Sequence, residues 1–133
     1  MNSLAEGATI DLVVFEASGW RIGFEARRVR ASRRVTETGP AYPTVESLLA
    51  LPVSQPSAKA SQCLTLVCPD GERDMLIRGT VELLSVATEF IHPLPPLIAA
   101  RNYLTGLRAL ILWPDRPLVL LFDTDALPFP MPH

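Results

Sequence analysis

The chain has 133 residues, which is the length of about one domain. Apolar residues make up 48% of it and charged residues 20%, a composition that excludes an intrinsically disordered chain. Twelve basic residues against fourteen acidic ones leave a net charge of −2, which excludes a strongly basic nucleic-acid-binding protein. The 13 prolines, about twice the usual share, argue against long helices and favour short strands joined by fixed turns.

The first part of the chain predicts a β-hairpin followed by a basic segment. Residues 10–15 (IDLVVF) are rich in β-branched and aromatic side chains, and residues 20–25 alternate between apolar and polar ones. A turn at residues 17–19 joins the two strands. The basic segment holds five arginines within eight residues: Arg27, Arg28, Arg30, Arg33 and Arg34. A solvated strand edge or docking onto an acidic partner explains such a cluster better than nucleic acid does, because no aromatic residue lies between Phe24 and Tyr42.

The middle of the chain predicts one short helix, a loop and a strand. Residues 44–51 are the best helix candidate, with Thr44 as the N-cap. Residues 52–62 hold two prolines and three serines and are expected to form a loop. Cys63 and Cys68 lie in the next predicted strand, where their odd offset places them on opposite faces. We therefore expect two separate buried thiols, rather than a disulfide or a metal clip.

The second half predicts further strands. Residues 74–86 are strand-like, with a bulge or bend at Gly79. Residues 92–96 (HPLPP) are expected to be irregular, because proline fixes φ and removes a hydrogen-bond donor. Residues 107–112 and 118–122 are predicted to form a final hairpin, and the apolar run LVLLF in its second strand should be buried on both faces.

Side chains suited to catalysis or metal binding are few. The two histidines, His92 and His133, have no obvious nucleophile partner in the sequence, and no catalytic or phosphate-binding motif is present. Asp123 and Asp125 are better explained as caps of the following turn or helix than as a cation site. We therefore expect no enzymatic activity, no catalytic residue, no cofactor and no bound metal.

The sequence also predicts where the protein works. Its first ten residues lack the basic and apolar regions of a signal peptide. Its apolar runs are far shorter than the eighteen or so residues that a membrane span needs. We expect a soluble, cytoplasmic protein with no membrane insertion and no nucleic-acid partner.

The order of the motifs resembles that of CheW-like domains, the coupling proteins of bacterial chemosensory arrays. The similarity is carried by the opening strand pair with Val29 after it, by Gly39–Pro52, by Ile91–Pro95 (IHPLP), by YLTGL at residues 103–107, and by the closing residues 118–127. The most specific part is the pattern I-x-P-x-P followed by YLTGL.

The resemblance implies a mostly β fold, with two small SH3-like β-barrel subdomains that share a core, the first of them truncated, and one or two short helices. It places a single CheW-like domain at residues 10–127, with intertwined halves at roughly 10–52 and 63–127, and leaves residues 128–133 as a flexible tail. Such a domain is a non-catalytic scaffold that links the cytoplasmic tip of a methyl-accepting chemoreceptor to a CheA-type histidine kinase.

The resemblance also implies a receptor-binding groove between the two subdomains, into which the family docks the helical receptor tip. Carried over position by position, the groove residues are Ala26, Val29, Leu76, Gly79, Val81 and Leu83. Because strand residues alternate between faces, only about half of these are expected to face the groove. Arg27, Arg28 and Arg30 would add charge at its rim.

Two departures from the family pattern bear on function. Only nine residues, 30–38, separate Val29 from Gly39, where the family has a long excursion that ends in N-L-R-G. In the family that excursion shapes the first subdomain, which contributes to kinase contact, and its arginine supports receptor binding. Its replacement here bears on the dual linking role, and on kinase binding above all. Arg78 also replaces the aspartate of the family's V-V-D pattern. The alternatives are a regulator that competes with a full-length adaptor, and a small β-barrel enzyme or ligand-binding domain.

Overall fold

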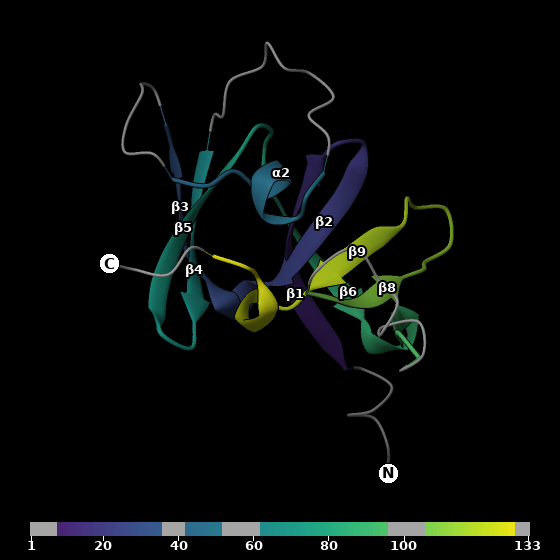
Figure 1. Ribbon diagram of the computed structural model, residues 1–133. Helices are drawn as coiled ribbons and strands as arrows, with labels where there is room; N and C mark the ends of the chain where they lie inside the picture. The colour runs from purple at the N-terminus through teal and green to yellow at the C-terminus, as the bar shows by residue number, and fades with distance from the viewer. Residues whose placement is uncertain (1–7, 36–41, 52–61, 96–105, 130–133) are drawn as a thin grey trace.

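The computed structural model describes residues 8–35, 42–51, 62–95 and 106–129. In these ranges the chain forms nine strands in two sheets, with one short α-helix and three 3₁₀ turns (Figure 1). The expectation of a mostly β chain with few helices is confirmed. Within the described ranges, no helix is long and apolar enough to cross a membrane.

The larger sheet is built from both ends of the chain, in the order β6-β1-β2-β9-β8-β7. Its strands are β1 (Thr9–Ala17), β2 (Trp20–Glu25), β6 (Glu82–Ala87), β7 (Ile91–Pro93), β8 (Leu107–Ile111) and β9 (Val119–Phe122). The predicted hairpin of β1 and β2 is confirmed, and its turn residues Ser18 and Gly19 have φ of 56° and 83°. Two positive φ values are typical of the type I′ turn, whose twist matches that of the flanking strands. β2 then pairs in parallel with β9.

The smaller sheet has the order β3-β4-β5. Its strands are β3 (Val29–Arg34), β4 (Gln62–Cys68) and β5 (Gly71–Ile77). The 3₁₀ turn η1 (Ala26–Arg28) carries the chain from β2 into this sheet, and residues 78–81 carry it back to β6. The prediction of one strand over residues 74–86 is therefore wrong. The chain crosses between sheets at Gly79, instead of bending within one strand.

The helix α2 (Val45–Leu48) begins where the sequence predicts. The Thr44 side chain accepts a hydrogen bond from the backbone N–H of Ser47 at 3.1 Å, which is an N-cap interaction. Just before the helix, the carbonyl oxygen of Pro43 accepts a hydrogen bond from the backbone N–H of Leu76 at 2.9 Å. The segment that leads into α2 therefore bridges the edge of β5 at Leu76, and α2 lies between the two sheets in Figure 1.

The proline-rich segment after η2 (Thr88–Phe90) is more regular than the sequence suggests. β7 pairs antiparallel with β8, so the prediction of an irregular segment is wrong for His92 and Pro93. Proline is tolerated there because β7 is an edge strand, and an edge residue can lack a donor on its outer side. The predicted hairpin of β8 and β9 is confirmed, and all four residues of β9 are buried.

Several predicted features fall outside the described residues. They include the segment around Gly39, the loop at 52–61 and the first three residues of the YLTGL motif. Of the predicted tail, the structure describes Pro128 and Phe129. Phe129 packs against the hydrophobic core between the two sheets.

Two hydrophobic cores lie on opposite faces of the larger sheet. One core fills the space between the two sheets and α2, with Phe24 and Leu66 fully buried in it. The other consists of Leu12, Val14, Val86, Ala109, Ile111, Val119 and Leu121. All members of this second core come from one sheet, so the sheet must curl around them. No ladder joins β6 to β7 within the described residues, so the larger sheet curls without closing into a barrel.

The close packing of β2 on β9 makes Gly23 a sensitive position. A Cβ atom there would lie 3.1 Å from Val119 Cγ1 and 3.5 Å from Val14 Cγ2. We expect Gly23→Ala to lower the free energy of unfolding by about 1–3 kcal/mol, because it overpacks a filled core. Urea denaturation measures this change. The control is Gly79→Ala, whose added Cβ meets nothing within 4 Å and should change stability by no more than about 0.5 kcal/mol. Equal losses in the two variants would contradict the argument.

Candidate functional site

Four of the six predicted groove residues lie around the core between the two sheets; we call Ala26, Val29, Val81 and Leu83 the inter-sheet seam. Ala26, Val29 and Val81 are partly buried and pack against that core. Leu83 projects from β6 opposite Val13, which belongs to the same core, yet 71% of Leu83 is exposed. The seam is therefore an apolar surface that is continuous with the protein interior and open to solvent at Leu83.

The other two predicted groove residues are placed differently. Leu76 pairs with Cys63, while its chain neighbours Met75 and Ile77 are buried in the core between the two sheets. Strand alternation therefore puts Leu76 on the outer face of the smaller sheet, away from the seam. Gly79 lies in the crossover that leads to Val81, and a side chain added there would enter open space.

The arginine cluster is mostly paired within the molecule. Four of its five arginines reach a carboxylate, in the pairs Arg27–Glu25 (2.5 Å), Arg28–Asp125 (3.2 Å), Arg30–Glu72 (2.7 Å) and Arg33–Asp74 (3.8 Å). The three predicted rim residues thus each have an acidic partner in the same chain. The Arg27 and Arg30 side chains are still 73% and 67% exposed, so they remain accessible to another molecule.

The pairs made by Arg30 and Arg33 cross the smaller sheet. Both arginines stand on β3, and their carboxylate partners stand on β5, on the far side of β4. Between them, Thr65 on β4 donates a hydrogen bond to Asp74 Oδ1 at 2.6 Å. These contacts hold the edge strand β3 to its sheet. Sequence reasoning missed them because Arg30 and Glu72 are 42 residues apart.

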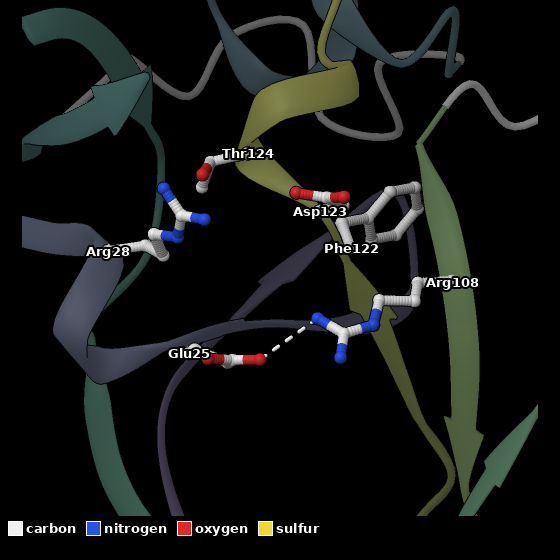
Figure 2. A pocket seen from close by; sticks show the side chains of 6 residues that line it. All are labelled: Glu25, Arg28, Arg108, Phe122, Asp123 and Thr124. Carbon is white, nitrogen blue, oxygen red and sulfur yellow. Dashed lines mark hydrogen bonds and ion pairs between the residues drawn. The ribbon is translucent and has the colours of Figure 1, made fainter. Parts of the chain in front are cut away.

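A polar hollow of about 60 Å³ lies where the two sheets meet (Figure 2). Its lining residues are Glu25, Arg28, Arg108, Phe122, Asp123 and Thr124. Figure 2 shows Arg108 reaching Glu25 from β8, and Arg28 extending from η1 toward the end of β9. Sites for small organic ligands usually enclose about 300–1,000 Å³. This hollow is better understood as a joint between elements than as a ligand site.

Glu25 is the centre of that joint. Its side chain is only 10% exposed, and its carboxylate accepts hydrogen bonds from Arg27 Nε at 2.5 Å and from Arg108 Nη1 at 2.9 Å. The hydrogen bond from Arg27 holds the pKa of Glu25 below its ordinary value, although burial alone would raise it. Glu25 is therefore ionised at neutral pH and ties η1 to β8.

The predicted role of Asp123 as a cap is confirmed. Asp123 Oδ1 accepts a hydrogen bond from the backbone N–H of Asp125 at 3.0 Å, which opens the 3₁₀ turn η3 (Thr124–Ala126). Thr124 Oγ1 then donates to the carbonyl oxygen of Val67 at 3.1 Å. Through these contacts η3 attaches the end of β9 to β4.

The cysteines lie as the sequence predicts. Cys63 and Cys68 are free and buried on opposite faces of β4, and burial raises the pKa of both thiols, which lowers their reactivity. His92 is exposed on β7, and His133 lies outside the described residues. In the part of the chain that the structure describes, no group of three or more His, Cys, Asp or Glu residues is arranged to hold a metal ion.

The structure is similar to the crystal structure of the scaffolding protein TtCheW from Thermoanaerobacter tengcongensis. The TM-score is 0.68, and the match covers 89% of this chain and 91% of that chain at 11% sequence identity. No family model matches the chain, and no curated protein matches it by sequence. At this identity the likeness establishes the fold alone: the chain has the mostly β, CheW-like fold that its motif order implies.

The Glu25 joint should make stability depend on pH. Folding lowers the pKa of Glu25. The contribution of its carboxylate to folding stability is therefore fully present above the ordinary glutamate pKa, about 4.3. This contribution is lost as the pH falls through the pKa that Glu25 has in the folded protein. We expect Glu25→Gln to lower the free energy of unfolding by about 1–3 kcal/mol at pH 7, with the difference from the unmodified protein shrinking below about pH 4. Chemical denaturation across this pH range measures it.

A matched control for that experiment is Glu82→Gln. Glu82 also pairs with an arginine, Arg21, but its side chain is 55% exposed. Its substitution should cost no more than about 1 kcal/mol. A difference between Glu25→Gln and the unmodified protein that stays constant from neutral to acidic pH would exclude the proposed role of Glu25.

Proposed function

We propose that this protein is a non-catalytic, cytoplasmic chemosensory adaptor that binds the signalling tip of a methyl-accepting chemoreceptor. The observation that carries the proposal is the CheW-like fold together with an apolar seam, open at Leu83, between its two sheets. Receptor tips are helical hairpins, and an apolar surface between two sheets suits recognition of the apolar face of a helix.

The seam has the properties that a helix-binding surface needs. Leu83 offers exposed apolar area, and Val29 and Val81 rest on a packed core that keeps them in place. Next to them, Gly79 leaves room for close approach of another backbone. At the rim, Arg27 and Arg30 present exposed guanidinium groups that can exchange a carboxylate of this chain for one on the receptor.

We also propose that the adaptor links the receptor to a CheA-type histidine kinase or modulates that kinase's pathway. Receptor binding is the better supported of the two contacts, because residues 30–38 replace the longer excursion that the family uses toward the kinase. In its shortness the chain is similar to the small CheW-like FrzB protein of the frizzy system. A chain that occupies the receptor without recruiting the kinase would act as a competitor of full-length adaptors.

A pulldown with two baits tests this function: a chemoreceptor signalling tip, and the regulatory domain of the kinase. We expect the receptor tip to retain the protein and the kinase domain to retain it weakly or not at all. Retention by neither bait would exclude the adaptor function. Retention by both with similar affinity would show that the short segment does not limit kinase contact.

Access to the seam is tested by Gly79→Trp, because Gly79 lies beside it in the crossover that leads to Val81. A Cβ at this position meets nothing within 4 Å, so the melting temperature should stay unchanged while receptor affinity falls at least about tenfold. Leu112→Trp is the control, because Leu112 is a half-exposed apolar residue outside the seam, and it should bind the receptor as the unmodified protein does. Isothermal titration calorimetry measures both. Unchanged affinity of the Gly79 variant would remove the seam from the binding surface.

A further inference from the structure

Four strands lie at sheet edges in the described part of the chain. β5 is bridged at Leu76 by Thr44, and the other three differ in how their edge is protected. Natural sheets block edges with charge, proline, bulges or short strands, because an open edge can pair with another chain. β3 has three arginines and a register shift between Val29 and Ala31. β7 is three residues long and ends in Pro93. β6 has six residues, no proline and no register shift, and Glu82 at its start is charged.

The edge of β6 is regular and mostly apolar. It keeps an unbroken register with β1 over six residue pairs, from Thr9↔Ala87 to Val14↔Glu82. Its only charged residue, Glu82, pairs at 3.3 Å with Arg21 on β2, so this side chain leans across β1 and away from the open edge. Leu83 is 71% exposed on the same strand. Such an edge is a template for strand addition.

We propose that β6 pairs antiparallel with β6 of a second copy of this chain, with a two-fold axis at Leu84 that joins two larger sheets into one. In this register Leu84 faces its own copy, and Leu83 faces Ser85 of the second copy. The two Leu83 side chains become diagonal neighbours, about 7–8 Å apart between Cα atoms and within reach of each other. The arrangement buries the most exposed large apolar side chain of the described residues.

Charge and symmetry favour a second copy as the occupant. The two Glu82 residues would be offset by four residues along the strands, about 14 Å, and each is already paired with Arg21. The same strand thus supplies both the unpaired backbone edge and the exposed Leu83 side chain. An identical strand can pair with both, and a two-fold interface requires this self-complementarity. This inference does not rest on the proposed receptor binding, although Leu83 belongs to both surfaces.

Sedimentation velocity of the full chain between about 1 and 200 µM tests the proposal, this range bracketing weak to moderate self-association. We expect a concentration-dependent dimer that Leu83→Lys converts to a monomer, because an edge lysine opposes strand addition. Leu112→Lys is the matched control and should remain dimeric, since Leu112 is also exposed but lies outside β6. Circular dichroism confirms that both variants fold. A protein that is monomeric throughout, or a Leu83→Lys variant that dimerises like the control, would overturn the proposal.

A second variant separates self-association from receptor binding. Ser85 is exposed on β6 and is not part of the seam. Ser85→Lys should abolish the dimer without weakening binding to the receptor tip, so each proposal can fail without the other. A Ser85→Lys protein that stays dimeric would contradict pairing through β6.

The register is tested by disulfide cross-linking of mixed variants. Leu83→Cys and Ser85→Cys should cross-link faster when mixed than either does alone, because these positions face each other across the axis. The native thiols of Cys63 and Cys68 are buried and contribute little background. If the protein dimerises but the mixture cross-links no faster than either variant alone, the proposed register is wrong.

Discussion

The parallel contact between β2 and β9 is the constraint on which the rest of the structure depends. It pairs residues 21–23 with residues 119–121, so it joins the two ends of the chain in one sheet. Because Gly23 has no side chain, Val119 and Val14 fill the space above it. Once β9 is in place, its alternating residues serve both cores: Val119 faces one and Leu120 the other. A strand buried on both faces leaves little freedom in the register of its neighbours.

An ion pair joins the segments that follow these two strands. β2 ends at Glu25 and runs into η1, and β9 ends before η3, where Arg28 and Asp125 form a two-pronged ion pair. The joint therefore lies where the chain leaves the larger sheet for the smaller one. Because most of the basic segment serves such internal pairs, the surface available to a partner is more apolar than the sequence suggests. The inter-sheet seam and the edge of β6 are the main examples.

The two proposals meet at Leu83. In the first, this side chain contacts a receptor helix; in the second, it is covered by another copy of the chain. A single residue cannot do both at once, so self-association would withdraw the adaptor from receptors and receptor binding would release it. This competition follows from the position of Leu83, on an edge strand and above the core between the sheets.

The local elements follow from short stretches of sequence. The β1–β2 turn follows from Ser18 and Gly19, the start of α2 from Thr44, and the burial of β9 from its unbroken apolar run. Each depends on turn chemistry, capping or side-chain periodicity within a few residues. The CheW-like fold was also predictable, because the order of such elements along the chain is a sequence property.

How the elements combine depends on contacts between distant parts of the chain. Residues 74–86 keep a strand-like pattern throughout, so nothing local indicates that the chain changes sheets at Gly79. Leu76 faces away from the seam because of the register in which β5 pairs with β4. Arg28 pairs with Asp125, which lies 97 residues away in the sequence. Packing between segments far apart in the chain decides which strands pair, in which register they pair, and which edges stay open.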